Sequence, residues 1–136
     1  MTYTPVKTNT MPIPAEPAII PVHLVGPSGA TADLAVYVPW KDCNLVYAYT
    51  VTTVAEGNKG AVEIDLELNA ASGTEIMTIT VAQDAAVGAV NEASFTTKSA
   101  GQALTRSNSS KDAVNIEIAG ITDNTWEGML YMYFER

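Results

Sequence analysis

Alternation of apolar and polar residues over residues 61–83 constrains the fold of this chain more than any other feature. The run AVEIDLEL places four apolar residues on one side of an extended chain and three carboxylates on the other (Val62, Ile64, Leu66, Leu68; Glu63, Asp65, Glu67). The segment NAASG after it suits a chain reversal, and the run GTEIMTITV then alternates again. The sequence therefore predicts a β-hairpin with one buried face and one solvent face that bears the carboxylates.

Short alternating runs of the same kind, separated by Gly, Ser, Asn and Asp, continue from residue 22 onward. This pattern is typical of an all-β sandwich, and 136 residues is an ordinary length for one domain. No segment combines helical periodicity with helix caps, and the polar segment 98–112 is expected to be an exposed loop. We predict a single antiparallel β-sandwich over residues 22–136, with strands near 20–25, 32–38, 44–54, 61–69, 74–82, 92–97, 113–119 and 126–135.

The first 21 residues differ in composition from the rest. Five of the seven prolines lie there, at positions 5, 12, 14, 17 and 21, in a segment without glycine. Each proline fixes its own φ and biases the preceding residue toward extended conformations. We therefore expect an extended Pro-rich arm over residues 1–21 that packs on its own domain, reaches over a neighbouring subunit or is disordered. Its apolar residues are candidate partner contacts: Met11, Ile13, Ile19 and Ile20.

The charge balance narrows the classes of partner. Seven Lys and Arg against fifteen Asp and Glu give a formal net charge of -8. Nucleic acid is therefore not expected as a partner, because affinity for a phosphate backbone depends on clustered cations. No apolar run approaches the roughly 20 residues that span a bilayer, and the N-terminus lacks the pattern of a secretory signal. We expect a soluble protein, made in the cytoplasm, that binds no membrane.

Residue types that support catalysis or metal binding are scarce. His23 is the single histidine and Cys43 the single cysteine, so a zinc site with several His or Cys ligands is not expected within one chain. A single cysteine also forms no intramolecular disulfide. The nucleophile motif G-x-S-x-G does not occur. We therefore expect no cofactor, no metal and no catalytic residue, and a protein that is not an enzyme.

The carboxylate row of residues 63–67 leaves several alternatives open. A charged outer face keeps a sheet soluble and discourages edge-to-edge pairing. The same oxygens suit a cation such as calcium, or a contact with a basic partner. Glu63 and Asp65 on one strand face lie roughly 7 Å apart by the strand rise, a separation that also suits a hydrolase of the glycosidase type.

Aromatic residues near the strand ends are the remaining candidate contacts. Trp40 follows a proline at the end of an apolar run, and Trp126 begins the last run, where a Trp is a core or interface anchor. In this last run, WEGMLYMYFER, both faces are apolar, so its strand is central in the sandwich or half covered by another subunit. Tyr131 and Tyr133 are its candidate partner contacts, and a homo-oligomer follows as a hypothesis.

Seven stretches, taken in order, carry a resemblance to a known group of proteins: VYVPW, CNLVYAYTVTTV, AVEIDLELN, GTEIMTITV, AAVGAVNEASFT, AVNIEIAG and the closing FER. Over residues 31–136 the chain resembles small β-sandwich proteins of tailed bacteriophages that act as capsid decoration, cement or head-fibre proteins. The resemblance implies a jelly-roll-like sandwich, commonly trimeric, that sits outside an icosahedral shell and ties neighbouring copies of the major capsid protein together. It carries over no catalytic residues and does not include the Pro-rich arm.

The expected function is therefore that of a structural virion protein on the capsid surface, with the major capsid protein as partner and a homotrimer as the favoured oligomer. The alternative is a carbohydrate- or receptor-binding module of a phage fibre or tail, because jelly-roll sandwiches suit that role equally well. In that case Trp40, Tyr47 or Tyr49 would stack on sugar rings. A hydrolase that uses Glu63 and Asp65 is a third alternative.

Overall fold

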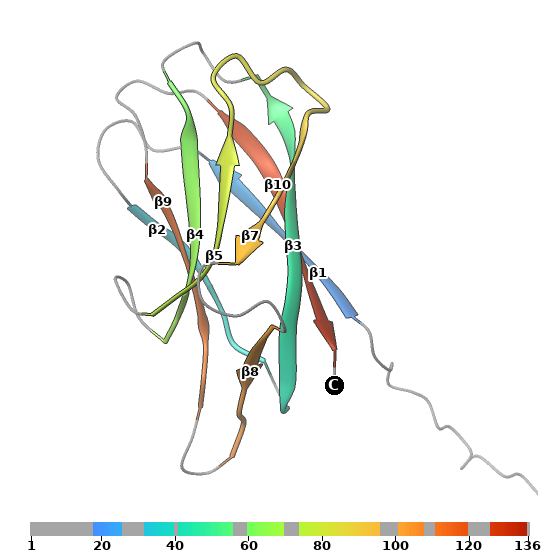
Figure 1. The fold of residues 1–136 in the computed structure, drawn as a ribbon, viewed down its shortest axis with the longest axis vertical. Helices are drawn as coiled ribbons and strands as arrows, with labels where there is room; N and C mark the ends of the chain where they lie inside the picture. Colours follow the sequence, from blue (N-terminus) through green and yellow to red (C-terminus); the bar gives the residue numbers. More distant parts are fainter. Residues whose placement is uncertain are drawn as a thin grey trace, which may run out of the picture.

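Two antiparallel β-sheets pack face to face in the computed structural model (Figure 1). The structure describes residues 18–25, 32–39, 41–55, 60–69, 74–95, 101–107, 111–119 and 126–135. All regular elements in these ranges are strands, as the alternation predicted. They are β1 (Ala18–Val25), β2 (Ala32–Tyr37), β3 (Cys43–Val54), β4 (Val62–Leu68), β5 (Thr74–Val81), β6 (Val90–Glu92), β7 (Ser94–Phe95), β8 (Gln102–Leu104), β9 (Val114–Ala119) and β10 (Glu127–Glu135).

The strand order is that of a jelly roll. One sheet has the order β1-β10-β3-β6, with β8 also paired to β3, and the other has the order β2-β9-β4-β5-β7. The first two strands therefore pair with the last two, β1 with β10 and β2 with β9, while β3 and β4 take the next places in their two sheets. This nesting of outer strand pairs around inner ones defines a jelly roll. The predicted antiparallel β-sandwich, with its jelly-roll character, is confirmed.

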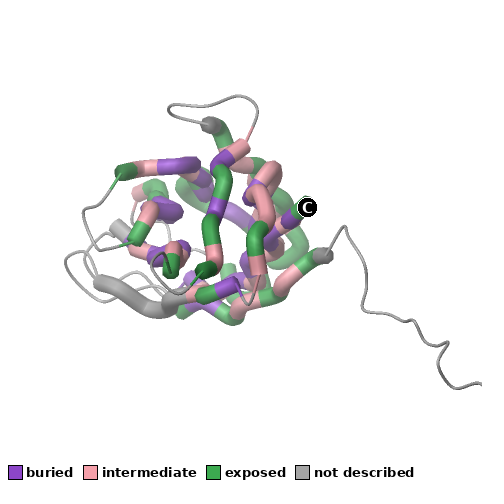
Figure 2. Tube along the Cα trace, turned by 90° about the horizontal axis from the view of Figure 1, so that it is seen from below, coloured by how far each residue is buried: buried purple, intermediate pink, exposed green. Residues whose placement is uncertain are grey.

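The hydrophobic core fills the space between the two sheets. Along the central strands every second side chain points inward, including Leu130 and Met132 of β10 and Ile64 of β4, all fully buried. Figure 2 shows the resulting alternation of buried and more exposed positions along the strands. Trp126 closes this core at one end: its side chain is fully buried, and its Nε1 donates a hydrogen bond of 2.9 Å to the Thr52 hydroxyl.

Strand β10 is apolar on both faces because it is central in its sheet. It pairs with β1 on one side and with β3 on the other over most of its length. Its inward side chains are buried, whereas Tyr131 and Tyr133 on its outward face are half-buried. The predicted central position is confirmed, and cover of the outward face by another subunit stays a prediction.

Three local predictions differ from the structure. Strand β1 begins at Ala18, two residues before the strand expected near 20–25, so residues 18–21 at the end of the expected arm belong to it; Pro21 is tolerated there because β1 is an edge strand among the described strands. The strand expected over 92–97 is two strands, because the chain passes at Ala93 from β6 in one sheet to β7 in the other. The segment 98–112 is not all exposed loop, since Leu104 of β8 is buried opposite Cys43.

Candidate functional surfaces

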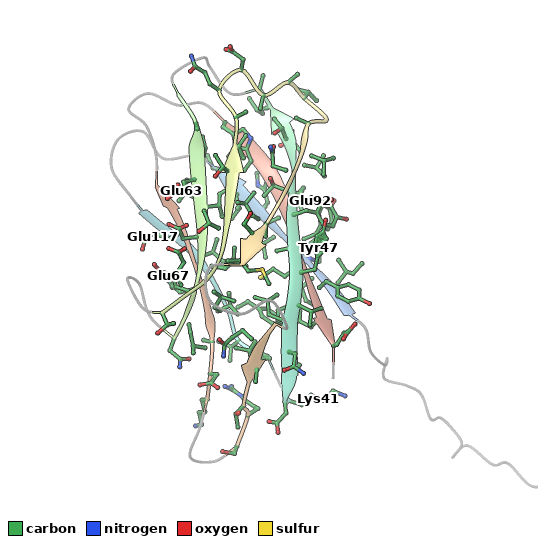
Figure 3. The ribbon with its side chains drawn as sticks, in the orientation of Figure 1. Lys41, Tyr47, Glu63, Glu67, Glu92 and Glu117 are labelled. Carbon is green, nitrogen blue, oxygen red and sulfur yellow. The ribbon has the colours of Figure 1, made fainter. Side chains whose placement is uncertain are left out.

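The two outer faces of the sandwich carry unlike side chains. Figure 3 shows Glu63, Glu67 and Glu117 projecting from the β4 and β9 side of the molecule, whereas Tyr47 and Glu92 project from the β3 side. One sheet therefore has an acidic outer face and the other has an aromatic and apolar one. These two faces are the candidate functional surfaces of the protein.

Four tyrosines lie together on the outer face of the β1-β10-β3-β6 sheet, and we call them the tyrosine quartet: Tyr47, Tyr49, Tyr131 and Tyr133. They meet because β3 and β10 pair in register, with Tyr49 opposite Tyr131 and Tyr47 opposite Tyr133. The rings of Tyr49 and Tyr131 stack, with centroids 5.1 Å apart and planes at 22°. The rings of Tyr47 and Tyr49 have centroids 5.7 Å apart. All four side chains are half-buried, so each ring keeps part of its surface open to a partner.

Strand β1 extends the aromatic face at the edge of the sheet. Ile19 lies opposite Tyr133, and Pro21 lies opposite Tyr131. Ile19 has 54% of its surface exposed and is one of the large apolar side chains that the described structure leaves open to solvent. The face therefore runs without interruption from the edge strand to the rings of β3.

Two polar contacts border the tyrosine quartet. Glu92 of β6 lies opposite Tyr49 and forms a hydrogen bond with the Tyr47 side chain. Burial raises the pKa of the Tyr47 phenol, and the hydrogen bond and charge of Glu92 act in the same direction. Farther along β1, His23 Nε2 lies 3.3 Å from Glu127 Oε2, a contact that becomes an ion pair when the imidazole is protonated. The quartet is thus an aromatic surface with carboxylates at its margin.

Exposed valines gather at one end of the same sheet, and we call them the valine tip: Val25, Val54, Val87 and Val90. Val25 and Val54 both lie opposite Glu127 in the paired strands, and Val90 begins β6 beside β3. Val87 and Val90 have 67% and 57% of their surfaces exposed. Aliphatic side chains this open to solvent at one end of a sheet favour a protein contact there, with Glu127 between Val25 and Val54.

The acidic face consists of five carboxylates on the outside of the second sheet: Glu63, Asp65, Glu67, Glu75 and Glu117. The prediction that the carboxylate row of β4 points freely to solvent is wrong for two of its members. Asp65 and Glu67 have only 8% and 7% of their surfaces exposed. Strand β4 lies between β5 and β9, so its outward side chains are crowded by neighbours on both sides. The apolar inward face of β4 is buried as predicted.

A threonine hydroxyl joins two of these carboxylates. Thr78 Oγ1 lies 2.9 Å from Asp65 Oδ1 and 2.8 Å from Glu75 Oε1. One hydroxyl has a single proton, so both contacts are hydrogen bonds at once only when one carboxyl group is protonated. The pKa of the Asp65 carboxyl is raised to about 6 in total: burial is the largest cause, the Thr78 hydrogen bond acts against it, and the charges of Glu63, Glu75 and Glu67 add to the rise. Protonation of Asp65 lets both contacts be hydrogen bonds, with the Asp65 carboxyl donating to Thr78 Oγ1 and the Thr78 hydroxyl donating to Glu75 Oε1.

The sequence-predicted contact residues of the N-terminal region have different outcomes. Met11, Ile13 and Trp40 lie outside the described residues. Ile19 is exposed beside the tyrosine quartet. Ile20 points to the other side of β1 and packs against the core. Only Ile19 of this group is therefore placed on a candidate contact surface by the described structure.

The contact residues predicted near the C-terminus also divide into two groups. Tyr131 and Tyr133 lie in the tyrosine quartet, where the structure brings them together with Tyr47 and Tyr49. Trp126 is fully buried and hydrogen-bonded within the core, so its assignment as a partner contact is corrected. Its position at the start of a strand was compatible with either a core or an interface anchor, and the inward direction of its side chain decides between them.

Sequence reasoning missed the valine tip and one member of the acidic face, Glu117. Glu117 alternates with isoleucines in the run VNIEIA, a signal that could have placed it outward. Val87 and Val90 lie in an alanine-rich segment without periodicity, so no pattern in the sequence indicates that they are exposed. Their exposure follows from turns at residues 83–84 and 87–88.

The fold and its surfaces define a jelly-roll sandwich with one aromatic and one acidic outer face. Comparison of the chain with protein-family models, with curated proteins and with solved structures finds no match. In the part of the chain that the structure describes, no helix is long and apolar enough to cross a membrane. No group of three or more His, Cys, Asp or Glu in that part is arranged to hold a metal ion. A function for this protein is therefore proposed from its two outer faces and the valine tip.

Proposed function

We propose that this protein is a structural virion component, without enzymatic activity, that binds the outside of an icosahedral phage capsid and stabilises it. The observation that carries the proposal is the contrast between the two outer faces. A decoration protein needs one surface that excludes water against its partners and another that stays hydrated. The aromatic and apolar sheet fits the first need, and the acidic sheet fits the second.

We assign the valine tip to the contact with the major capsid protein. Aliphatic side chains carry no hydrogen-bonding groups, so they can be buried against an apolar depression without leaving a polar atom unsatisfied. Full burial of one exposed valine contributes roughly 1.5 kcal/mol, and four such side chains share one end of the sheet. Three linked copies, as in the homotrimer that the resemblance favours, multiply a modest affinity per site.

Co-sedimentation with bare capsids from the phage whose structural genes neighbour this one tests the proposal. We expect binding that saturates at a fixed number of copies per major capsid protein subunit. The double substitution Val87→Asp with Val90→Asp is expected to weaken binding at least tenfold, because it places charges in a contact that excludes water.

Val38→Asp is the matched control for this experiment. Val38 is also exposed, but it follows β2 at the opposite end of the sandwich from the valine tip. The control adds a carboxylate without touching the proposed contact, so it should bind capsids like the unchanged protein. If the unchanged protein does not bind capsids, the decoration function is wrong. If the double variant binds as tightly as the unchanged protein, the valine tip is not the contact with the major capsid protein.

A second candidate function, recognition of a carbohydrate or receptor by a phage fibre or tail, is favoured by one observation. The stacked rings of Tyr49 and Tyr131, with Glu92 nearby, combine an aromatic platform with a hydrogen-bonding carboxylate. Such a combination suits a sugar ring, whose faces are apolar and whose edge is polar. A glycan array tests this candidate. Binding to a glycan that is lost in Tyr131→Ala would support carbohydrate recognition, and an array without signal would contradict it.

A further inference from the structure

We propose that the tyrosine quartet is the docking surface for residues 1–17 of a second copy of this chain. This contact joins copies of the protein to one another and does not depend on a capsid. The proposal rests on the chemistry of the quartet, on the composition of residues 1–17, on the point where that segment enters the fold and on the distribution of charge.

The quartet has the chemistry of a surface that binds proline-rich chains. Strand pairing places its rings side by side, with the Tyr49 and Tyr131 centroids 5.1 Å apart. Aromatic-lined surfaces of this kind bind polyproline II segments, whose rings and backbone lie against the aromatic faces. Ile19 and Pro21 extend the apolar surface at its edge. The face is half-open in one chain and is therefore available to a partner.

Residues 1–17 have the composition that such a surface binds. They include four prolines, and the run PIPAEP holds three of them at positions 12, 14 and 17. A polyproline II helix has three residues per turn, so Met11, Pro14 and Pro17 share one side of it. Proline also reduces the conformational freedom that a bound segment loses, which lowers the entropic cost of docking.

The point of entry directs this segment toward another copy. Residue 17 joins β1 at Ala18, which lies opposite Phe134 at the edge of the sheet that carries the quartet. To lie on its own quartet the chain would have to fold back over the outer face of its own sheet just before Ala18, because Ile19, the next residue, already lies opposite Tyr133. Seventeen residues in polyproline II conformation span about 50 Å, whereas four adjacent strands span about 14 Å. The segment is therefore long enough to cross a neighbouring sheet.

The charge distribution also favours this contact between copies. Residues 1–17 contain one cation, Lys7, and one anion, Glu16, so the formal charge of -8 belongs to residues 18–136, which hold six Lys and Arg and fourteen Asp and Glu. Two such bodies repel each other, and a neutral segment makes contact without adding like charge. Lys7 is complementary to Glu92 beside Tyr47. Head-to-tail contacts of this type form a ring, such as a cyclic trimer, when the rotation between copies closes, and an open chain of copies when it does not.

Sedimentation velocity with the full chain tests the proposal. The unchanged protein is expected to associate at micromolar concentration. Pro14→Gly with Pro17→Gly, which changes only the donated segment, and Tyr49→Ser with Tyr131→Ser, which changes only the docking surface, should each weaken association at least tenfold. Tyr49→Phe with Tyr131→Phe keeps the rings and should associate like the unchanged protein.

A mixture of the two weakened variants decides whether the contact runs between copies. The proline variant has an intact quartet and the serine variant has an intact segment, so the mixture should form heterodimers that neither variant forms alone. A monomeric unchanged protein, full association of the proline variant, or a mixture that stays monomeric would each overturn the proposal. The proline variant changes no residue of the sandwich, so it keeps the test valid if the serine variant misfolds. No capsid is present, so failure here is separate from failure of the decoration function.

Discussion

Replacing Gly128 with alanine is expected to lower the free energy of unfolding by about 3 kcal/mol and the melting temperature by roughly 10 °C. A Cβ atom at this position would collide with Cζ2 of Trp126 and would lie 2.8 Å from Cη2 of the same ring and 2.9 Å from the carbonyl oxygen of Val51. Trp126 cannot withdraw easily, because its ring is fully buried and its Nε1 is hydrogen-bonded to Thr52. The backbone of β10 is likewise held by pairing with β3. Thermal and denaturant unfolding measure the loss.

Gly88→Ala is the matched control for this substitution. The change is chemically the same, but a Cβ at Gly88 meets no atom within 4 Å. Gly88 has a φ of 90°, so alanine there costs only the backbone strain, roughly 1 kcal/mol. A double-mutant cycle with Trp126→Phe isolates the collision, because phenylalanine lacks the two ring atoms that the new Cβ would meet. Equal costs for the Gly128 and Gly88 substitutions would show that the contact with Trp126 is not the cause.

The sandwich could be predicted from the sequence because alternation reports which side of a strand each residue takes. The runs around residues 61–83 and 126–135 specify their inward faces in this way, and the structure buries those faces. Alternation does not report which strands become neighbours. β10 pairs with β3 across more than 70 residues of sequence, and that register is what brings the four rings of the tyrosine quartet together. The sequence therefore indicated single tyrosines and not their assembly.

The same limit explains the wrong expectation for the carboxylate row of β4. Its polar side was identified correctly, but the burial of Asp65 and Glu67 depends on β5 and β9, which flank β4 in the sheet. Strand β8 was missed for a related reason, since a run of three residues carries too little periodicity to distinguish it from a loop. Its placement depends on Leu104, which is buried opposite the first residue of β3.

Asp65→Asn is expected to stabilise the protein by about 2 kcal/mol at neutral pH and to have little effect near pH 4. The pKa of Asp65 is about 6 in the folded protein against an ordinary value of 3.8. Each pKa unit corresponds to about 1.4 kcal/mol, so ionisation of Asp65 costs the fold up to about 3 kcal/mol. Between those two pH values the folded state binds a proton that the unfolded chain has released, so stability falls as pH rises. Asparagine stays neutral and still offers Thr78 a hydrogen-bond partner.

The charges that face Asp65 come from its own strand and from both neighbours, namely Glu63 and Glu67 of β4, Glu75 of β5 and Glu117 of β9. Glu63→Gln removes a carboxylate from the same face at an exposed position, so it should change stability by less than about 0.5 kcal/mol. Thr78→Val removes the hydrogen bond that lowers the pKa of Asp65 and should move its titration, followed by NMR of the carboxyl carbon, to higher pH. A pH profile of unfolding that is the same for Asp65→Asn and the unchanged protein would show that Asp65 is ionised in the fold at no cost. The acidic face would then be an ordinary hydrated surface throughout.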